Sequence, residues 1–109
     1  MSRAERIRFQ RIARHFHNYQ REFQTLKEQE GEEEWRTMAL QALEENITLT
    51  EHTLELIRQK HGVKAEQMTR DWLLEHKTQA EIAAESGISE RHVRRLLEAY
   101  LNDALGEDK

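Results

Sequence analysis

Apolar side chains recur along the first half of the chain at alternating spacings of three and four residues. This spacing places them on one face of an α-helix and is typical of a heptad seam. We therefore predict two long helices that end near Gly31 and Gly62, because glycine readily adopts the backbone conformation that closes a helix. The first seam consists of Phe9, Ile12, Phe16, Tyr19, Phe23 and Leu26, and the second of Leu40, Leu43, Ile47, Thr50, Leu54 and Ile57.

The starts of both predicted helices carry their own signals. Ser2, followed three residues later by Glu5, is a capping box that predicts the start of the first helix. The acidic run at residues 32–34 suits the positive end of the second helix dipole. The second helix is expected to run to about His61, with a kink near residues 48–50 as an alternative, because β-branched residues lower helix propensity. Two such helices joined at a glycine predict a helical hairpin.

The last third of the chain predicts three shorter helices. The first spans about residues 64–76. The second begins at a capping box formed by Thr78 and Glu81 and ends before Gly87. The third begins at Ser89, a residue type that commonly caps a helix N-terminus.

The spacing inside this segment predicts a helix-turn-helix. The motif needs a small residue where its two helices cross and, four residues later, a residue that tolerates positive φ; Ala83 and Gly87 fill these positions. Apolar residues that hold the two helices together are present as Ile82, Ile88, Val93 and Leu96. With no proline and only four glycines, the chain has few residues for the tight turns of β folds. We predict an all-α chain with a coiled-coil-like oligomerisation hairpin over residues 1–61 and a three-helix DNA-binding domain over residues 62–109.

The outward face of the last helix is rich in arginine, because Arg91, Arg94 and Arg95 lie off its apolar face. Arginine binds guanine or phosphate in a bidentate manner, and such side chains suit a helix in the major groove. The alternative is that the three arginines only solvate an exposed helix and pair with Glu90 or Glu98. We predict DNA contacts by Thr78, Gln79, Ser89, Glu90, Arg91, His92, Arg94 and Arg95.

This segment resembles the DNA-binding region of bacterial sigma factors in the runs Thr78-Gln79-Ala80-Glu81-Ile82-Ala83, Gly87-Ile88-Ser89 and Val93-Arg94-Arg95-Leu96. As a whole, the chain resembles the small phage transcriptional regulators of the RinA/ArpU type, which combine a helical N-terminal part with a sigma-region-4-like helix-turn-helix. The motif resemblance covers about residues 66–105, whereas the N-terminal part matches in character only. It implies DNA binding by the last helix in a regulator of late or lysis genes, and it allows a contact with RNA polymerase.

Charge divides the chain into three parts, although the total is only −4. Residues 1–27 have a net charge of +5, residues 28–56 of −8 and residues 57–109 of −1. A basic helix followed by an acidic one suits an antiparallel pair with complementary flanks, although solvated faces of opposite sign explain the pattern equally well. We expect the acidic part to face away from DNA. The basic part either contacts phosphate as a second surface or flanks the acidic helix of a partner chain, through Arg3, Arg6, Arg8, Arg11 and Arg14.

Other classes of protein and of site lack their signals. No run approaches the roughly 18 apolar residues of a membrane span. No apolar run follows the basic N-terminus, as it would in a secretory signal. The absence of cysteine fits a reducing cytoplasm. No histidine pair with metal-ligand spacing, nucleophile elbow or phosphate-binding loop occurs, so we predict no metal, no cofactor and no enzyme. Trp35 and Trp72 are expected to be core or interface anchors.

Together these patterns predict a cytoplasmic, sequence-specific DNA-binding regulator of phage or prophage origin. It dimerises, or forms a higher homo-oligomer, through the hairpin and reads the major groove with the helix that starts at Ser89. Two alternatives stay open. One is the DNA-recognition small subunit of a phage terminase, and the other is a protein-interaction module whose helix-turn-helix never touches DNA.

Overall fold

The computed structural model describes residues 3–29, 31 and 33–106. The described residues form six helices and no strand: α1 (Arg3–Arg14), α2 (Phe16–Glu28), α3 (Glu34–His61), α4 (Val63–Leu73), α5 (Gln79–Ser86) and α6 (Glu90–Leu105). The chain is therefore all-α, as its pattern predicts. The predicted cap at Ser2 lies outside the described residues. None of the described helices is both long and apolar enough to cross a membrane.

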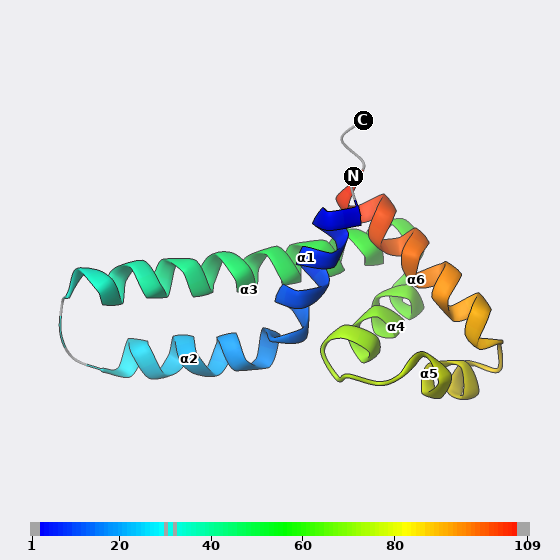
Figure 1. The fold of residues 1–109 in the computed structure, drawn as a ribbon, viewed down its shortest axis with the longest axis horizontal. Helices are drawn as coiled ribbons and strands as arrows, with labels where there is room; N and C mark the ends of the chain where they lie inside the picture. The colour runs from blue at the N-terminus through cyan, green and yellow to red at the C-terminus, as the bar shows by residue number, and fades with distance from the viewer. Residues whose placement is uncertain (1–2, 30, 32, 107–109) are drawn as a thin grey trace.

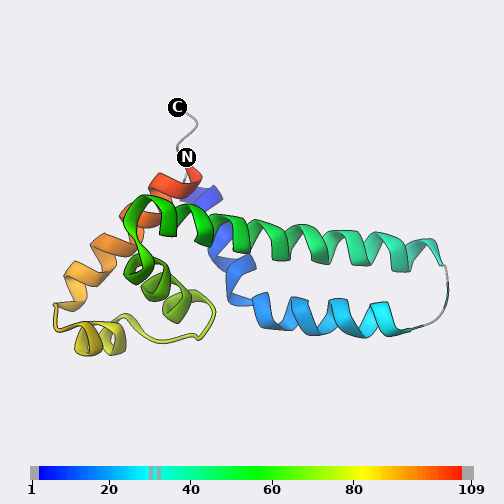
Figure 2. The same cartoon turned by 180° about the vertical axis from the view of Figure 1, so that it is seen from behind.

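The helices are arranged along an elongated molecule of 51 × 32 × 23 Å. Helices α2 and α3 lie side by side in opposite directions, and the end of α2 and the start of α3 lie at one end of the long axis (Figure 1). Helices α4, α5 and α6 gather at the other end, where the turn between α5 and α6 is the outermost part. Helix α1 crosses one side of α3, and the view from behind leaves α3 unobscured along its length (Figure 2).

The main hydrophobic cluster joins both halves of the chain. Its buried members are Phe9, Ala13, Phe16, Leu54, Ile57, Ala65, Leu73, Leu74, Leu101 and Ala104. A second cluster between α5 and α6 consists of Ile82, Ala83, Val93 and Leu97. The side chains of Trp72 and Tyr100 are half-buried and pack against both clusters. The C-terminal half of α3 thus shares one core with α1, α4 and α6, on both sides of the expected domain boundary at residues 61–62.

The single helix predicted over the first seam is in fact two helices, so that prediction was wrong. The chain leaves the α conformation at His15, with φ −102° and ψ 14°, and the His15 N–H bonds to the Ile12 carbonyl at 3.2 Å. The break lets α1 turn Phe9 and Ala13 into the core shared with α4 and α6, while α2 follows α3. The apolar periodicity does not reveal the break at His15, because the spacing from Phe9 to Phe16 stays in heptad register across it.

Helix α3 is continuous over Glu34–His61, with no interruption at residues 48–50. The hydroxyl of Thr50 donates to the Asn46 carbonyl at 3.0 Å, so this β-branched residue is satisfied within the helix. The helix ends at Gly62, as predicted, where φ is 99° and the Gly62 N–H bonds to the Arg58 carbonyl at 2.8 Å. The C-terminal part of the predicted seam is buried, whereas Leu40, Leu43 and Ile47 are half-buried.

Helix α4 ends three residues earlier than predicted, at Leu73. The Glu75 N–H still reaches the Arg70 carbonyl at 3.0 Å, but His76 then adopts a positive φ of 59°. A side chain at positive φ is costly unless something holds it there. Here the Nε2 of His76 donates to the carbonyl of Arg14, the last residue of α1, at 2.8 Å. A contact between distant segments therefore sets this boundary.

Arg36 holds the connection between α2 and α3 together. The last carbonyls of a helix have no partner inside it and need one from elsewhere. The guanidinium of Arg36 donates to the carbonyls of Leu26, Lys27, Gln29 and Gly31. Its neighbour Trp35 is exposed, so of the two expected roles, core or interface anchor, the core role does not apply to Trp35.

Candidate nucleic-acid interface

Helix α5 begins at a reciprocal capping box, as the sequence predicts. The Thr78 hydroxyl accepts from the Glu81 N–H at 3.0 Å, and the Thr78 N–H donates to Glu81 Oε1 at 2.8 Å. Hydrogen bonding from Thr78, chiefly from its backbone N–H, lowers the pKa of the Glu81 carboxyl. The start of α5 is thus fixed by two hydrogen bonds, one of which is accepted by the Glu81 carboxylate.

The turn between α5 and α6 also has the predicted geometry. Gly87 is left-handed, with φ 72° and ψ 27°, and its N–H bonds to the Ala83 carbonyl at 2.9 Å. Ser89 caps α6, since its Oγ accepts from the His92 N–H at 3.1 Å. The two helices therefore meet at a tight turn with a cap on each side.

The buried residues beneath the turn fix the angle between the two helices. Ala83 and Ile82 of α5 pack against Val93 and Leu97 of α6, and Ile88 is half-buried beside them. An ion pair joins the segment before α5 to the last turn of this helix, because Lys77 Nζ lies 3.0 Å from Glu85 Oε1. The hydrogen bond to Glu85 is the main cause that raises the pKa of the Lys77 ammonium. The outward residues of α6 are thus presented by a packed support.

The predicted DNA-contacting residues lie at the start of α5 and along the first half of α6. Gln79 is half-buried and the other seven are exposed: Thr78, Ser89, Glu90, Arg91, His92, Arg94 and Arg95. The capping bonds use the hydroxyl oxygens of Thr78 and Ser89 as acceptors, and a hydroxyl that accepts can still donate its proton. The structure brings all eight residues to the same end of the molecule (Figure 1).

The three arginines of α6 have exposed guanidinium groups. Within the described part of the chain, none of Arg91, Arg94 and Arg95 pairs with a carboxylate. Pairing with Glu90 or Glu98, the alternative expected from the sequence, is therefore not what the structure has. Arg91 and Arg95 are four residues apart and share the face opposite Val93. Three unpaired cations in five residues make this surface suitable for an anionic ligand.

The acidic start of α3 lies away from this surface. It is at the opposite end of the long axis from the turn between α5 and α6 (Figure 1). The positive end of the α6 dipole lies at the arginine-bearing end. The acidic start of α3 is thus remote from the arginines of α6, although residues 57–109 as a whole have a net charge of −1.

The basic N-terminal residues contribute partly to packing, a role that the sequence did not reveal. Arg6 donates to Asn102 Oδ1 of α6 at 2.9 Å, and the Arg14 guanidinium lies 5.2 Å from the ring centre of Trp72. Cations stack favourably on aromatic faces. Arg8 and Arg11 are exposed beside α3.

Histidines also serve contacts between helices. His61 Nε2 lies 2.8 Å from Asp103 Oδ2, and His17 Nε2 lies 3.3 Å from Glu75 Oε2. Among the described residues, no three histidine or carboxylate side chains form a group that could hold a metal ion. The site's chemistry is therefore that of cationic and hydroxyl donors.

Comparison with protein-family models finds none that matches, and neither the curated proteins nor the solved structures provide a match. The resemblance to regulators of the RinA/ArpU type stays an expectation from the motif. The function is accordingly argued from the surface formed by α5 and α6.

Proposed function

We propose that the protein is a sequence-specific DNA-binding regulator of transcription, in which α5 and α6 act as the helix-turn-helix. The observation that carries the proposal is the set of exposed, unpaired arginines on α6, directly after a capped turn. Helix α6 enters the major groove with its N-terminal half, as recognition helices do.

Each proposed contact follows from side-chain chemistry. Arg91, Arg94 and Arg95 bind guanine edges or phosphate oxygens, and Glu90 accepts from a cytosine amino group. Thr78 and Ser89 donate their hydroxyl protons to phosphate, which positions the protein without reading sequence. Gln79 and His92 contact DNA at the edge of this proposed interface.

The proposed architecture places DNA binding in residues 62–109 and self-association in residues 1–61. Two copies then present two α6 helices to two half-sites of a symmetric operator. Phage or prophage origin, cytoplasmic location and a contact with RNA polymerase are part of the proposal through the family resemblance alone.

Binding of fluorescently labelled DNA tests the role of the arginines. Direct base contacts are worth about 1–3 kcal/mol each, so Arg91→Ala, Arg94→Ala and Arg95→Ala together should weaken specific binding by a hundredfold or more. Arg21→Ala is the matched control, because Arg21 is also exposed but lies on α2. Unchanged affinity in the triple variant would contradict the proposal and favour the protein-interaction module, whereas ring-sized assemblies on DNA would favour a terminase subunit.

A further inference from the structure

The N-terminal half of α3 carries an exposed apolar stripe beside its packed seam. Trp35, Met38, Ala42 and Leu49 follow one another at spacings of three, four and seven residues, so they share one side of the helix. The exposed fractions are 59% for Trp35, 63% for Met38 and 38% for Leu49. Large apolar side chains in such a row on a small protein mark an interaction site.

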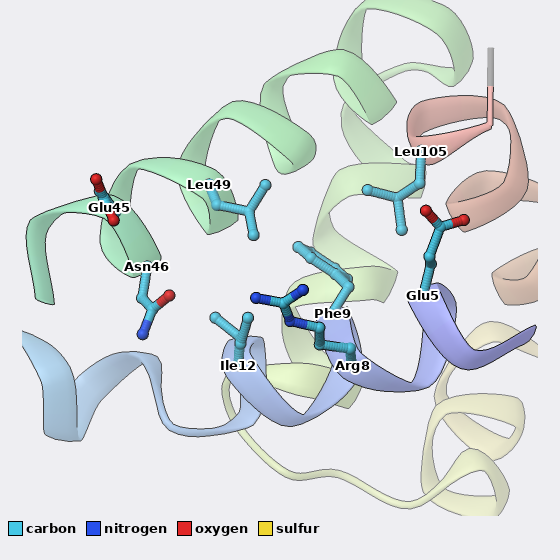
Figure 3. A pocket seen from close by; sticks show the side chains of 8 residues that line it. All are labelled: Glu5, Arg8, Phe9, Ile12, Glu45, Asn46, Leu49 and Leu105. Carbon is cyan, nitrogen blue, oxygen red and sulfur yellow. The ribbon is translucent and has the colours of Figure 1, made fainter. Parts of the chain in front are cut away.

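A hollow lies at the far end of this stripe, where α1 crosses α3 (Figure 3). It has a volume of about 400 Å³ and is lined by Glu5, Arg8, Phe9 and Ile12 of α1, Glu45, Asn46 and Leu49 of α3, and Leu105 of α6. A neighbouring hollow of about 750 Å³ continues along α1 past Arg8 and Ile12. The same side of α3 thus carries a protruding tryptophan at one end and an apolar-floored recess at the other.

In an antiparallel pair of α3 helices, the residue spacing brings the tryptophan of one copy to the recess of the other. Ala42 lies seven residues from Trp35 and seven from Leu49, or about 10 Å in each direction along the helix. A two-fold axis at Ala42 therefore places Trp35 of each copy over Leu49 of the other. The small side chain of Ala42 permits close approach at the axis.

Charge indicates that the occupant is a second copy of the chain. The carboxylates of Glu33 and Glu34 are exposed at the start of α3, next to Trp35. Arg8 and Arg11 are exposed and line the neighbouring hollow, which has no carboxylate in its lining, whereas the recess itself also holds Glu5 and Glu45. Neither arginine has a carboxylate partner in the described part of the chain. In the antiparallel arrangement the acidic start of one α3 reaches α1 of the other copy, and the symmetry makes this contact twice.

We propose that two copies of this chain associate about a two-fold axis near Ala42, with Trp35 of each copy seated between α1 and α3 of the other. Glu33 and Glu34 of each copy then face Arg8 and Arg11 of the other. This dimer supplies the second α6 that the proposed function requires. Its biological role rests on that proposed function. The association itself requires no DNA.

Sedimentation equilibrium without DNA tests the association. The chain of 13.1 kDa should sediment at twice that mass at micromolar concentration. Buried tryptophans are frequent hot spots, so Trp35→Glu should weaken the dimer about a hundredfold or more. Val63→Glu is the matched control, because Val63 is 62% exposed but lies at the start of α4. Circular dichroism of each variant verifies that the helices remain.

Charge exchange tests the predicted contact between α1 and α3. Arg8→Glu and Glu34→Arg should each weaken self-association, because each places like charges together. An equimolar mixture of the two variants should recover much of the dimer, since the mixed pair restores both opposite-charge contacts. If the mixture associates no more strongly than either variant alone, the proposed register is wrong.

Cross-linking tests the position of the axis. The chain contains no cysteine, so Ala42→Cys introduces a single thiol that should form a disulfide between copies under mild oxidation. Thr48→Cys, exposed on another side of α3, should cross-link much more slowly. A folded monomer, or equal rates at both positions, would overturn the proposal. A dimer that binds no DNA would instead contradict only the proposed function.

Discussion

At the scale of single residues, side chains that join distant parts of the chain determine the local structure. Arg36 is the clearest case, because it is the only basic residue in the acidic part of the chain and binds the carbonyls at the end of α2. Its charge was evident from the sequence. Its partners were not, because they depend on how the connection between α2 and α3 folds back.

Replacement of this arginine should loosen that connection. Arg36→Met keeps much of the apolar stem but removes the Arg36 donor from the carbonyls of Leu26 and Gln29, of which the Leu26 carbonyl retains only the Gln29 N–H at 3.3 Å. Loss of partners for partly buried polar groups costs about 1–3 kcal/mol, so the free energy of unfolding in urea should fall by that amount. The same change at exposed Arg21 should have little effect. Equal losses in the two variants would show that Arg36 has no special role.

The capping box at Thr78 should make part of the stability depend on pH. The pKa of Glu81 is lowered in the folded state, so its contribution is fully present above the unfolded pKa and is lost as pH falls through the folded one. Thr78→Ala removes the cap and should cost about 1 kcal/mol near neutral pH. The stability difference between the wild type and the variant should narrow as the solution is acidified below the folded pKa of Glu81. A difference that stays constant across this titration would contradict the assignment.

At the scale of elements, helix type and most helix ends followed from the sequence, because glycines and capping residues act locally. Gly62, Thr78, Gly87 and Ser89 each mark the predicted boundary. The break at His15 escaped prediction because the apolar spacing continues across it. The early end of α4 escaped as well, because His76 is held by a carbonyl 62 residues away in sequence.

The end of α4 can be tested through backbone conformation. A β-branched residue strongly disfavours positive φ, whereas glycine adopts it freely, and the left-handed conformation costs an ordinary residue about 1–2 kcal/mol. His76→Val should therefore be less stable than His76→Gly by at least that amount, although both lose the bond to Arg14. Urea unfolding of the two variants measures the difference. Equal stabilities would mean that the segment after Leu73 relaxes into another conformation.

At the scale of the whole molecule, the arginine-bearing start of α6 and the acidic start of α3 lie towards opposite ends of the long axis. The candidate site residues were predictable because caps, turn and arginines lie close together in sequence. The exposed stripe on α3 and the recess beside α1 were not, because the recess exists only after the chain breaks at His15. The shared core across residues 61–62 also depends on contacts far apart in sequence.

Salt should control DNA affinity if the arginines of α6 contact phosphate. Each phosphate contact contributes about one unit to the slope of log affinity against log salt. Each α6 arginine that contacts phosphate should therefore lower the slope by about one when replaced by alanine. Arg21→Ala should leave it unchanged. A wild-type affinity independent of salt would exclude a phosphate-bound interface.

Selection of bound sequences from a random pool of double-stranded DNA tests the central claim most directly. The proposed function predicts that one sequence is enriched, as two inverted half-sites whose centres lie about one helical turn apart, and that the triple arginine variant does not enrich it. A pool that stays random after selection at low salt, or equal enrichment by the triple variant, would contradict recognition of DNA by α6.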